Sequence, residues 1–312
     1  MIMEIILLLA GTALVLWGAD KFTDGASGLA RKWHVSELVI GLTIVAAGTS
    51  LPEFMVSLIS AVRGSGDMSA GNIIGSNIFN SLVILGAAAL MMPLFVGKSL
   101  LHRDIPFSVL VSLVLFALVF FDGCVSRADS LVFLVLFAAY LCYTYHVAMK
   151  GKKGEATVEE AGGDVSYVRL VLQIVVGMAA LVIGARLMVT EGASMARSLG
   201  VSETVIGLTI LAGGTSLPEL ATSVVAARKG RAGLAVGNVI GSNIFNIACI
   251  LGVCALINPM LVAGIAPTDW AVLAGSGVMV WIVGFTKGKI EKWEGALLLL
   301  CYLGYMVNLI SK

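Results

Sequence analysis

Two glutamates, Glu53 and Glu219, lie in apolar stretches that are long enough to cross a membrane and that occur twice in the chain. Residues 35–53 read VSELVIGLTIVAAGTSLPE and residues 201–219 read VSETVIGLTILAGGTSLPE, which is 16 identities in 19 positions at an offset of 166. A carboxylate inside a membrane costs at least about 2.5–3.5 kcal/mol, so it needs a partner or a cavity. Neither stretch holds a Lys or Arg beside its glutamate, and two adjacent carboxylates repel unless they share protons or bind a cation. The alternative is a pair of protonated glutamates that serve as structural hydrogen-bond donors.

A proline precedes each glutamate and predicts a break in the helix. Pro52 and Pro218 have no N–H, and the ring of each clashes with the carbonyl four residues earlier. Backbone carbonyls at 46–48 and 212–214 should therefore be freed, which a membrane tolerates only where they line a cavity or contact a ligand. A spacing of three and four residues places two hydroxyl side chains on the helix face of each glutamate: these are Thr49 and Ser50, and Thr215 and Ser216.

A second repeated motif supplies amides and further hydroxyls. Residues 71–80 (GNIIGSNIFN) match residues 237–246 (GNVIGSNIFN) at nine of ten positions, again at an offset of 166. Polar side chains recur every four residues along one helix face of each copy, and glycines beside them allow helices to approach closely. We interpret Ser76, Asn80, Ser242 and Asn246 as residues of a cation cavity. For Asn72 and Asn238, hydrogen bonding between helices is an equally good interpretation.

The donors in these motifs are all hard oxygen atoms. Calcium takes six to eight oxygen ligands, including carboxylates and backbone carbonyls. Zinc and copper prefer His or Cys, and neither residue occurs in the motifs. Two carboxylates give a charge near −2, which one Ca²⁺ or two Na⁺ would balance. The five cysteines, which fall in or beside apolar runs, are expected to be packing residues, and the three histidines lie at the ends of such runs.

The composition places the motifs in a polytopic membrane protein. Hydrophobic residues make up 59% of the 312 positions and charged residues 12%, against about 45–50% and 25% in soluble domains. An ordinary cytosolic enzyme, a nucleic-acid binder and a disordered chain are thereby excluded. The first apolar run lacks the basic start and the small-residue cleavage site of a signal peptide. Apolar runs predict an all-α protein of ten transmembrane helices: 3–21, 35–62, 69–92, 105–121, 128–148, 168–190, 201–228, 233–257, 267–286 and 293–310.

The duplication divides these spans into two groups of five. We expect a first repeat at 1–149, a cytoplasmic linker at 150–167 and a second repeat at 168–312. Because five is an odd number, the second repeat enters the membrane in the opposite sense, which brings the two motifs together near the midplane as in transporters with inverted repeats. The loops after odd-numbered spans hold 15 of the 20 Lys and Arg residues. The positive-inside rule therefore predicts that both termini lie outside the cytoplasm.

The paired GTSLPE and GN-[IV]-IGSNIFN motifs resemble the α-repeats of the cation/Ca²⁺ exchanger superfamily, and the compact chain resembles the prokaryotic sodium/calcium exchangers. The resemblance covers essentially the whole chain. It implies alternating access in which spans 1 and 6 slide past a rigid core. It implies cation ligands at the following positions: Glu53, Glu219, Thr49, Ser50, Thr215, Ser216, Ser76, Asn80, Ser242, Asn246 and the carbonyls of Ala46 and Ala212.

One position departs from part of the family. Some members, including potassium-dependent exchangers, have Asp where this chain has Asn246, which argues against K⁺ transport and leaves the Na⁺ count open. Proton/calcium exchangers carry a glutamate in the second motif, where this chain has Gly-Ser, and this favours Na⁺ over H⁺.

The sequence thus predicts a plasma-membrane antiporter that exchanges Na⁺ for Ca²⁺ and extrudes Ca²⁺ from the cytoplasm. No cofactor, nucleic acid or catalytic residue is expected, and a monomer should suffice for transport. An H⁺/Ca²⁺ antiporter is the nearest alternative. A gated calcium channel would need one continuous pore, and an intramembrane enzyme acting on lipid would need basic residues beside the acids.

Overall fold

The computed structural model describes residues 2–120, 122–151, 166–200, 212–262 and 264–310 of the chain. Its first half consists of α1 (Ile2–Lys32), α2 (Glu37–Ile40), the π-helical segment η1 (Gly41–Val45), α3 (Ala46–Thr49), α4 (Leu51–Val62), α5 (Gly66–Phe79), η2 (Asn80–Ile84), α6 (Leu85–Met91), β1 (Leu94–Phe95), η3 (Leu100–Asp104), α7 (Ile105–Val119), β2 (Cys124–Val125) and α8 (Arg127–Gly151). The second half consists of α9 (Tyr167–Ser198), α11 (Ala212–Gly214), α12 (Leu217–Arg228), α13 (Ala232–Ile244), η5 (Phe245–Leu251), α14 (Gly252–Ile257), β3 (Met260–Leu261), α15 (Pro267–Lys287), β4 (Lys289–Ile290) and α16 (Lys292–Ile310). The fold is all-helical apart from four two-residue strands in the described ranges.

Seven helices in the described part of the chain are long and apolar enough to span a membrane, and an eighth span is the bent pair formed by 37–49 and 51–62. The expected span at 201–228 lies partly outside the described residues, and the span expected at 293–310 corresponds to α16. The chain is therefore a multi-pass membrane protein built from two helical repeats.

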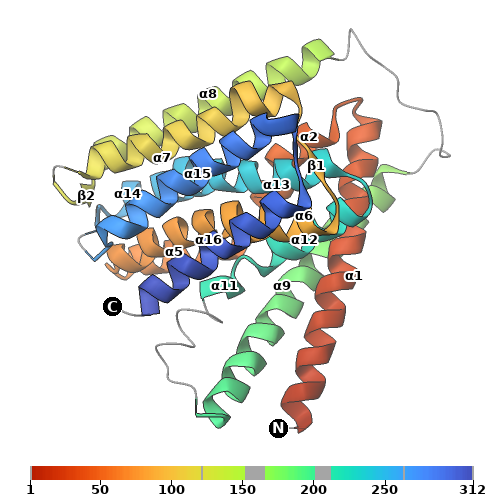
Figure 1. Cartoon of the computed structure of the whole chain (residues 1–312), viewed down its shortest axis with the longest axis horizontal. Helices are drawn as coiled ribbons and strands as arrows, with labels where there is room; N and C mark the ends of the chain where they lie inside the picture. The colour runs from red at the N-terminus through yellow and green to blue at the C-terminus, as the bar shows by residue number, and fades with distance from the viewer. Residues whose placement is uncertain (1, 121, 152–165, 201–211, 263, 311–312) are drawn as a thin grey trace.

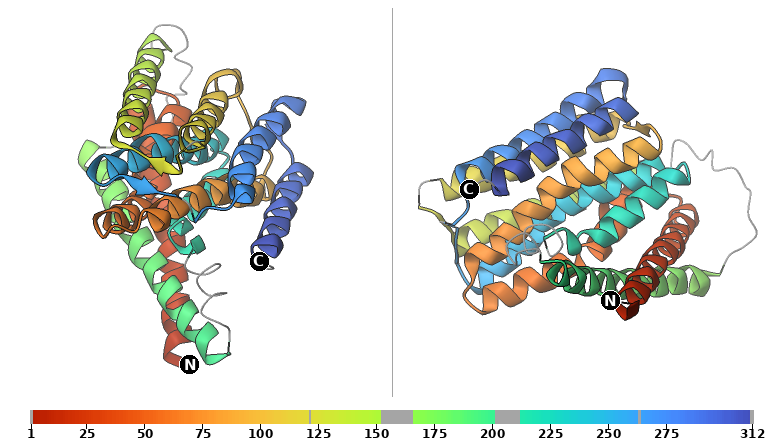
Figure 2. Two further views of the ribbon diagram at one scale, coloured as in Figure 1. Left: turned by 90° about the vertical axis from the view of Figure 1, so that its left-hand side faces the viewer. Right: turned by 60° about the horizontal axis from the view of Figure 1, so that its bottom comes forward.

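Helices α1 and α9 are much longer than the spans expected at 3–21 and 168–190. They contain 31 and 32 residues, or about 47 Å of helix each at 1.5 Å per residue. The polar residues placed in loops after these spans continue the helix instead, because no Pro interrupts it before Lys32 or Ser198 and the glycines at 25, 28 and 192 stay helical. Figures 1 and 2 show the two helices side by side along one flank of the remaining bundle, with their far ends extending beyond it.

Four glycines let α1 and α9 approach closely. A Cβ atom at Gly11 would lie 2.9 Å from the carbonyl oxygen of Gly184, and one at Gly18 would lie 2.7 Å from that of Gly177. Gly11 and Gly177 are separated by 166 residues, as are Gly18 and Gly184. The two contacts are therefore the same contact seen from opposite repeats, so α1 and α9 pack about a pseudo-twofold axis.

The short strands show the same inversion. Leu94 of β1 pairs with Ile290 of β4, and Cys124 of β2 pairs with Leu261 of β3, both antiparallel. An offset of 166 converts the β1 positions into those of β3, and an offset of 165 converts the β2 positions into those of β4. Each repeat thus supplies one strand to each two-stranded sheet. The same exchange joins α6 to α16 and α14 to α8.

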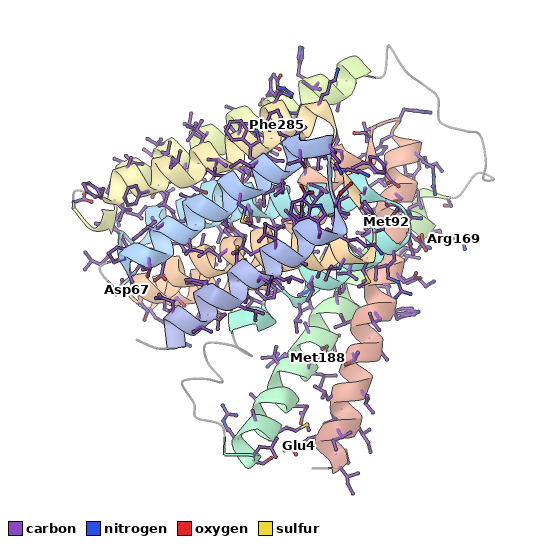
Figure 3. The ribbon with its side chains drawn as sticks, in the orientation of Figure 1. Glu4, Asp67, Met92, Arg169, Met188 and Phe285 are labelled. Atoms are coloured by element: carbon purple, nitrogen blue, oxygen red, sulfur yellow. The ribbon has the colours of Figure 1, made fainter. Side chains whose placement is uncertain are left out.

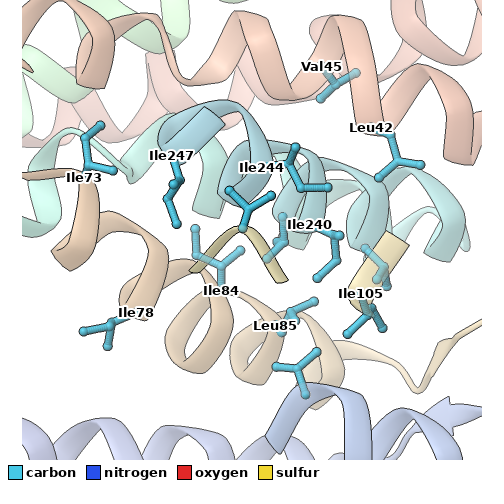
Figure 4. Close-up of a cluster of buried hydrophobic side chains, with 14 of the residues drawn as sticks. Leu42, Val45, Ile73, Ile78, Ile84, Leu85, Ile105, Ile240, Ile244 and Ile247 are labelled. Carbon is cyan, nitrogen blue, oxygen red and sulfur yellow. The ribbon is translucent and has the colours of Figure 1, made fainter. Parts of the chain in front are cut away.

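An apolar core lies between the central helices of the two repeats. Figure 4 shows Ile240, Ile244 and Ile247 facing Ile84 and Leu85 across the repeat interface. All five side chains are at most 2% exposed. This interface fixes α5–η2 against α13–η5, the elements that carry the second polar motif.

Candidate cation site

Each glutamate lies just after a helix break, as its proline predicts. In the first repeat α3 ends at Thr49 and α4 begins at Leu51, with Pro52 in the first turn and a bend of 48° between the two parts. In the second repeat α11 ends at Gly214 and α12 begins at Leu217. Both glutamates therefore occupy the first turn of a helix, where the helix dipole favours negative charge.

The two carboxylates are held by serines from the opposite repeat. Ser216 Oγ donates to Glu53 Oε1 at 2.8 Å, and Ser50 Oγ donates to Glu219 Oε1 at 2.9 Å. Glu53 is 1% exposed and Glu219 is fully buried. Neither forms an ion pair with a Lys or Arg in the described ranges. The structure thus brings both repeated GTSLPE segments into a single buried cluster.

Asn72 and Asn238 hold the helices that present the glutamates. Asn72 Nδ2 donates to Ser57 Oγ at 2.9 Å and to the Glu53 backbone carbonyl at 3.3 Å. Asn238 Nδ2 makes the equivalent bonds to Ser223 Oγ at 2.9 Å and to the Glu219 carbonyl at 3.4 Å. Of the two interpretations of these amides, helix-to-helix bonding matches the geometry.

Nine buried side-chain oxygen atoms in the described part of the chain have no hydrogen-bond partner there, and six belong to residues of the predicted cation site. An unpaired buried oxygen costs about 1–3 kcal/mol, so six in one cluster indicate a ligand rather than a chance of packing. All six have lone pairs that can coordinate a cation. They are Glu53 Oε2, Ser76 Oγ, Asn80 Oδ1, Thr215 Oγ1, Glu219 Oε2 and Asn246 Oδ1.

The carbonyl of Ala46 is not freed in the way the proline argument predicts. It accepts the Ser50 N–H at 3.1 Å and lies 3.5 Å from Ser242 Oγ. The reason is that Pro52 removes the partner of Gly48, four residues earlier, whereas Ala46 has its partner at Ser50. Thr49 Oγ1 lies 3.4 Å from the same oxygen, so both lone pairs of the Ala46 carbonyl have donors in this structure. Its counterpart Ala212 is the first residue of α11.

Two hydroxyls predicted as ligands differ from their repeat counterparts. Thr49 Oγ1 lies 3.0 Å from Asn238 Oδ1 and 3.0 Å from the Val45 carbonyl oxygen, either of which can accept its proton. Thr215 Oγ1 has no partner among the described residues. Ser242 contacts the Ala46 carbonyl, whereas Ser76 Oγ has no partner in the part of the chain that the structure describes. The cluster is therefore pseudo-symmetric in its acids and asymmetric in its hydroxyls.

Asn77 and Asn243 were not singled out from the sequence, yet they contact the predicted ligands directly. Asn246 Nδ2 donates to Asn77 Oδ1 at 2.9 Å, and Asn80 Nδ2 donates to Asn243 Oδ1 at 3.1 Å. The repeat held the signal, because both asparagines are shared by the two GSNIFN segments. They lie outside the four-residue spacing of the polar face, so that spacing does not predict their contacts.

An ion-pair network joins α1 to the loop between α12 and α13. Lys229 Nζ lies 2.6 Å from Asp20 Oδ1 and 2.8 Å from Asp24 Oδ1, and Arg231 Nη1 lies 2.9 Å from Asp24 Oδ1. Arg231 also lies 3.8 Å from Glu37.

At the far end of α1, Ser194 donates to Glu4. Figure 3 labels Glu4 near the N-terminus, close to the far end of α9, with Met188 on α9 nearer the bundle. The ion pairs of Asp20 and Asp24 therefore fix one end of α1 to the bundle, and the bond between Ser194 and Glu4 joins its other end to α9.

The site offers oxygen atoms alone. No group of three or more His, Cys, Asp or Glu side chains with metal-binding geometry occurs within the described residues, and the five cysteines are unpaired. A buried cluster of carboxylate, amide and hydroxyl oxygens between two inverted repeats defines a cation transporter rather than an enzyme.

Comparison with known proteins agrees with this class. The family model for the sodium/calcium exchanger protein matches residues 3–146 and 169–311. The sodium/calcium exchanger MaX1 of Methanosarcina acetivorans is 34% identical over 97% of both chains. The inner membrane protein YrbG of Escherichia coli is 38% identical over 83% of this chain and 81% of its own.

The fold also matches a solved exchanger. The sodium-calcium exchanger NCX_Mj superposes with a TM-score of 0.84 at 33% identity, covering 99% of each chain. Structures of that protein were obtained after soaking with Na⁺ and Ca²⁺ or with Na⁺ and Sr²⁺. The chain belongs to the sodium/calcium exchanger family and is a cation/Ca²⁺ exchanger of the NCX_Mj type.

Proposed function

We propose that the protein exchanges Na⁺ for Ca²⁺ across the inner membrane and extrudes Ca²⁺ from the cytoplasm. The observation that carries the proposal is the pair of buried carboxylates, each bonded to a serine of the opposite repeat and neither paired with a Lys or Arg among the described residues. Their joint charge near −2 matches one Ca²⁺ or two Na⁺. Competition of the two ions for the same oxygens couples their movements, because binding of one excludes the other.

The ligands follow from the oxygen atoms around the glutamates. Glu53 and Glu219 supply the charge, and the unpartnered oxygens of Ser76, Asn80, Thr215 and Asn246 complete the sphere. Hydroxyls already bonded elsewhere must rotate before they can join, since a hydroxyl has two acceptor lone pairs but a single proton. The remaining expected ligands in this class are Thr49, Ser50, Ser216, Ser242 and the carbonyls of Ala46 and Ala212.

Sliding of α1 and α9 supplies alternating access in this proposal. Close backbone contacts at Gly11, Gly18, Gly177 and Gly184 pack the two helices against each other as one unit. The two helices can therefore move together along the bundle while the α4–α5 and α12–α13 pairs keep the site intact. Both termini lie outside the cytoplasm and the 150–167 linker lies inside, as the distribution of Lys and Arg predicts.

The test is uptake of ⁴⁵Ca²⁺ into proteoliposomes with Na⁺, H⁺ or K⁺ gradients imposed in turn. We expect an outward Na⁺ gradient to drive uptake, a K⁺ gradient to drive none, and added K⁺ to leave the Na⁺-driven rate unchanged because Asn246 carries no charge. Uptake driven by a pH gradient alone would assign the protein to the H⁺/Ca²⁺ class. Uptake without any counter-ion gradient, set by voltage alone, would indicate a channel.

A further inference from the structure

The two asparagines beside the predicted ligands form crossed pairs at the repeat interface. Asn77 Oδ1 of α5 accepts a hydrogen bond from Asn246 Nδ2, and Asn243 Oδ1 of α13 accepts one from Asn80 Nδ2. An offset of 166 converts one pair into the other. All four side chains are at most 5% exposed, so water does not compete for these bonds.

An asparagine beside a cation has two orientations with opposite effects. Its Oδ1 attracts the cation, whereas its NH₂ group presents two donor protons and repels it. A carboxylate has no such ambiguity. A site that uses Asn80 and Asn246 in place of acids therefore needs a device that keeps their NH₂ groups away from the ion.

The orientation of Asn246 follows from a backbone carbonyl. Asn77 Nδ2 donates to the main-chain oxygen of Asn243 at 3.0 Å. That oxygen can only accept, so Asn77 must turn its NH₂ toward it and its Oδ1 toward Asn246. Asn246 must then turn its NH₂ toward Asn77. Its Oδ1 is left facing away from that pair and has no partner among the described residues.

Asn80 is oriented by a similar but weaker chain of bonds. Asn243 Nδ2 donates to Ser81 Oγ at 2.9 Å, which turns Asn243 Oδ1 toward the amide of Asn80. A serine hydroxyl can either donate or accept, so it restricts the amide less strictly than a carbonyl does. The repeat counterpart of Ser81 is Ile247, so this bond occurs on one side alone.

We infer that Asn77 and Asn243 are positioning residues that lock the ligand amides of Asn246 and Asn80 with oxygen toward the transported cation. This inference rests on the proposed function, since it assumes that Asn80 and Asn246 face the ions. Asn77 and Asn243 touch no cation themselves. Their role is to let a neutral amide act as a reliable oxygen ligand.

The test compares Asn77→Leu in two backgrounds by equilibrium ⁴⁵Ca²⁺ binding to purified protein. With Asn246 present, loss of the lock should raise the Kd about tenfold, because a freed amide exposes its donors to the ion. In the Asn246→Asp background the same substitution should change the Kd by less than about twofold, because a carboxylate has no donor to misdirect. Equal losses in both backgrounds, or no loss with Asn246 present, would overturn the inference.

The mirror pair provides an independent test if Asn77→Leu does not fold. Asn243→Leu leaves the Asn243 main-chain oxygen in place, so it frees Asn80 without disturbing Asn77. Its effect should be large with Asn80 and small with Asn80→Asp, and a loss independent of residue 80 would contradict the lock. Ser81→Ala should weaken binding less than Asn243→Leu does. Wild-type Ca²⁺ binding by itself tests the proposed function, whereas the ratio between backgrounds tests the asparagines.

Discussion

The two repeats share almost the same motif sequence, but their glycine edges are packed differently. On α13 a Cβ atom at Gly241 would lie 2.7 Å from Leu42 Cα, and one at Gly237 would lie 2.8 Å from the Leu38 carbonyl oxygen. On α5 the equivalent Gly71 and Gly75 are exposed, and no described residue would lie within 4 Å of a Cβ there. The residues that match Leu38 and Leu42 at the repeat offset are 204 and 208, which lie outside the described residues, so the comparison rests on the contacts of the α13 edge.

Hydrogen bonds and ion pairs accompany the glycine contacts of the α13 edge. On the α13 edge Thr49 and Ser242 are hydrogen-bonded, and the preceding loop is joined to α1 by ion pairs. On the α5 edge Thr215 and Ser76 are unpartnered among the described residues. The described residues therefore show how the α13 edge is closed: α2 and η1 pack against it, and Thr49 and Ser242 form hydrogen bonds across it.

The acids are the feature the two sides share, so changing either one should have the largest effect. Glu53→Gln and Glu219→Gln each remove half of the site's charge while keeping its volume. Breaking a buried charge interaction costs about 3–5 kcal/mol, which corresponds to a loss of more than a hundredfold in affinity. We expect Ca²⁺ flux in proteoliposomes to vanish in both variants. A near-normal rate in either one would show that the two acids do not serve one site.

The glycine edges should respond oppositely to a single methyl group. Gly241→Ala forces Leu42 to move and should destabilise the protein by about 1–3 kcal/mol. Gly75→Ala meets no described neighbour and should be neutral, or stabilising by up to about 1 kcal/mol through its helix preference. Thermal unfolding of the purified variants measures both. Equal destabilisation by the two substitutions would mean that the α5 edge is packed as well.

The ion pairs should give the smallest effect. Lys229→Gln removes the contacts to Asp20 and Asp24, which are partly exposed and worth about 0.2–1 kcal/mol each. Its repeat counterpart Arg63 forms no ion pair with a described residue, so Arg63→Gln is the matched control. The difference in melting temperature should fall as choline chloride is raised, because salt screens exposed pairs. A salt-independent difference would point to packing by the lysine stem.

The main features of the site could be predicted from the sequence because they are local. Pro52 breaks its helix whatever the surrounding fold. Because each repeat has an odd number of spans, the duplication places Glu219 opposite Glu53. The lengths of α1 and α9 were not predictable from hydropathy, because a helix can continue through polar residues such as Asp20 and Asp24 when they find charged partners elsewhere in the fold. The same limit hid the roles of Asn77 and Asn243, whose bonds cross the repeat interface.

The difference between the glycine edges could not be predicted at all. Gly75 and Gly241 occupy nearly identical sequence contexts, so no rule of spacing or propensity distinguishes them. The contacts of Gly241 with Leu42 and Ala46 follow from the packing of α13 against η1 and α3, which spacing along one helix does not contain.

The most direct test of the central claim is the number of Ca²⁺ ions bound per chain. Two acids in one shared site should bind one ⁴⁵Ca²⁺ per chain at equilibrium, Na⁺ should displace it competitively, and either Glu53→Gln or Glu219→Gln should abolish it. Two bound Ca²⁺ per chain, or loss of half of the binding in each single variant, would contradict a shared site.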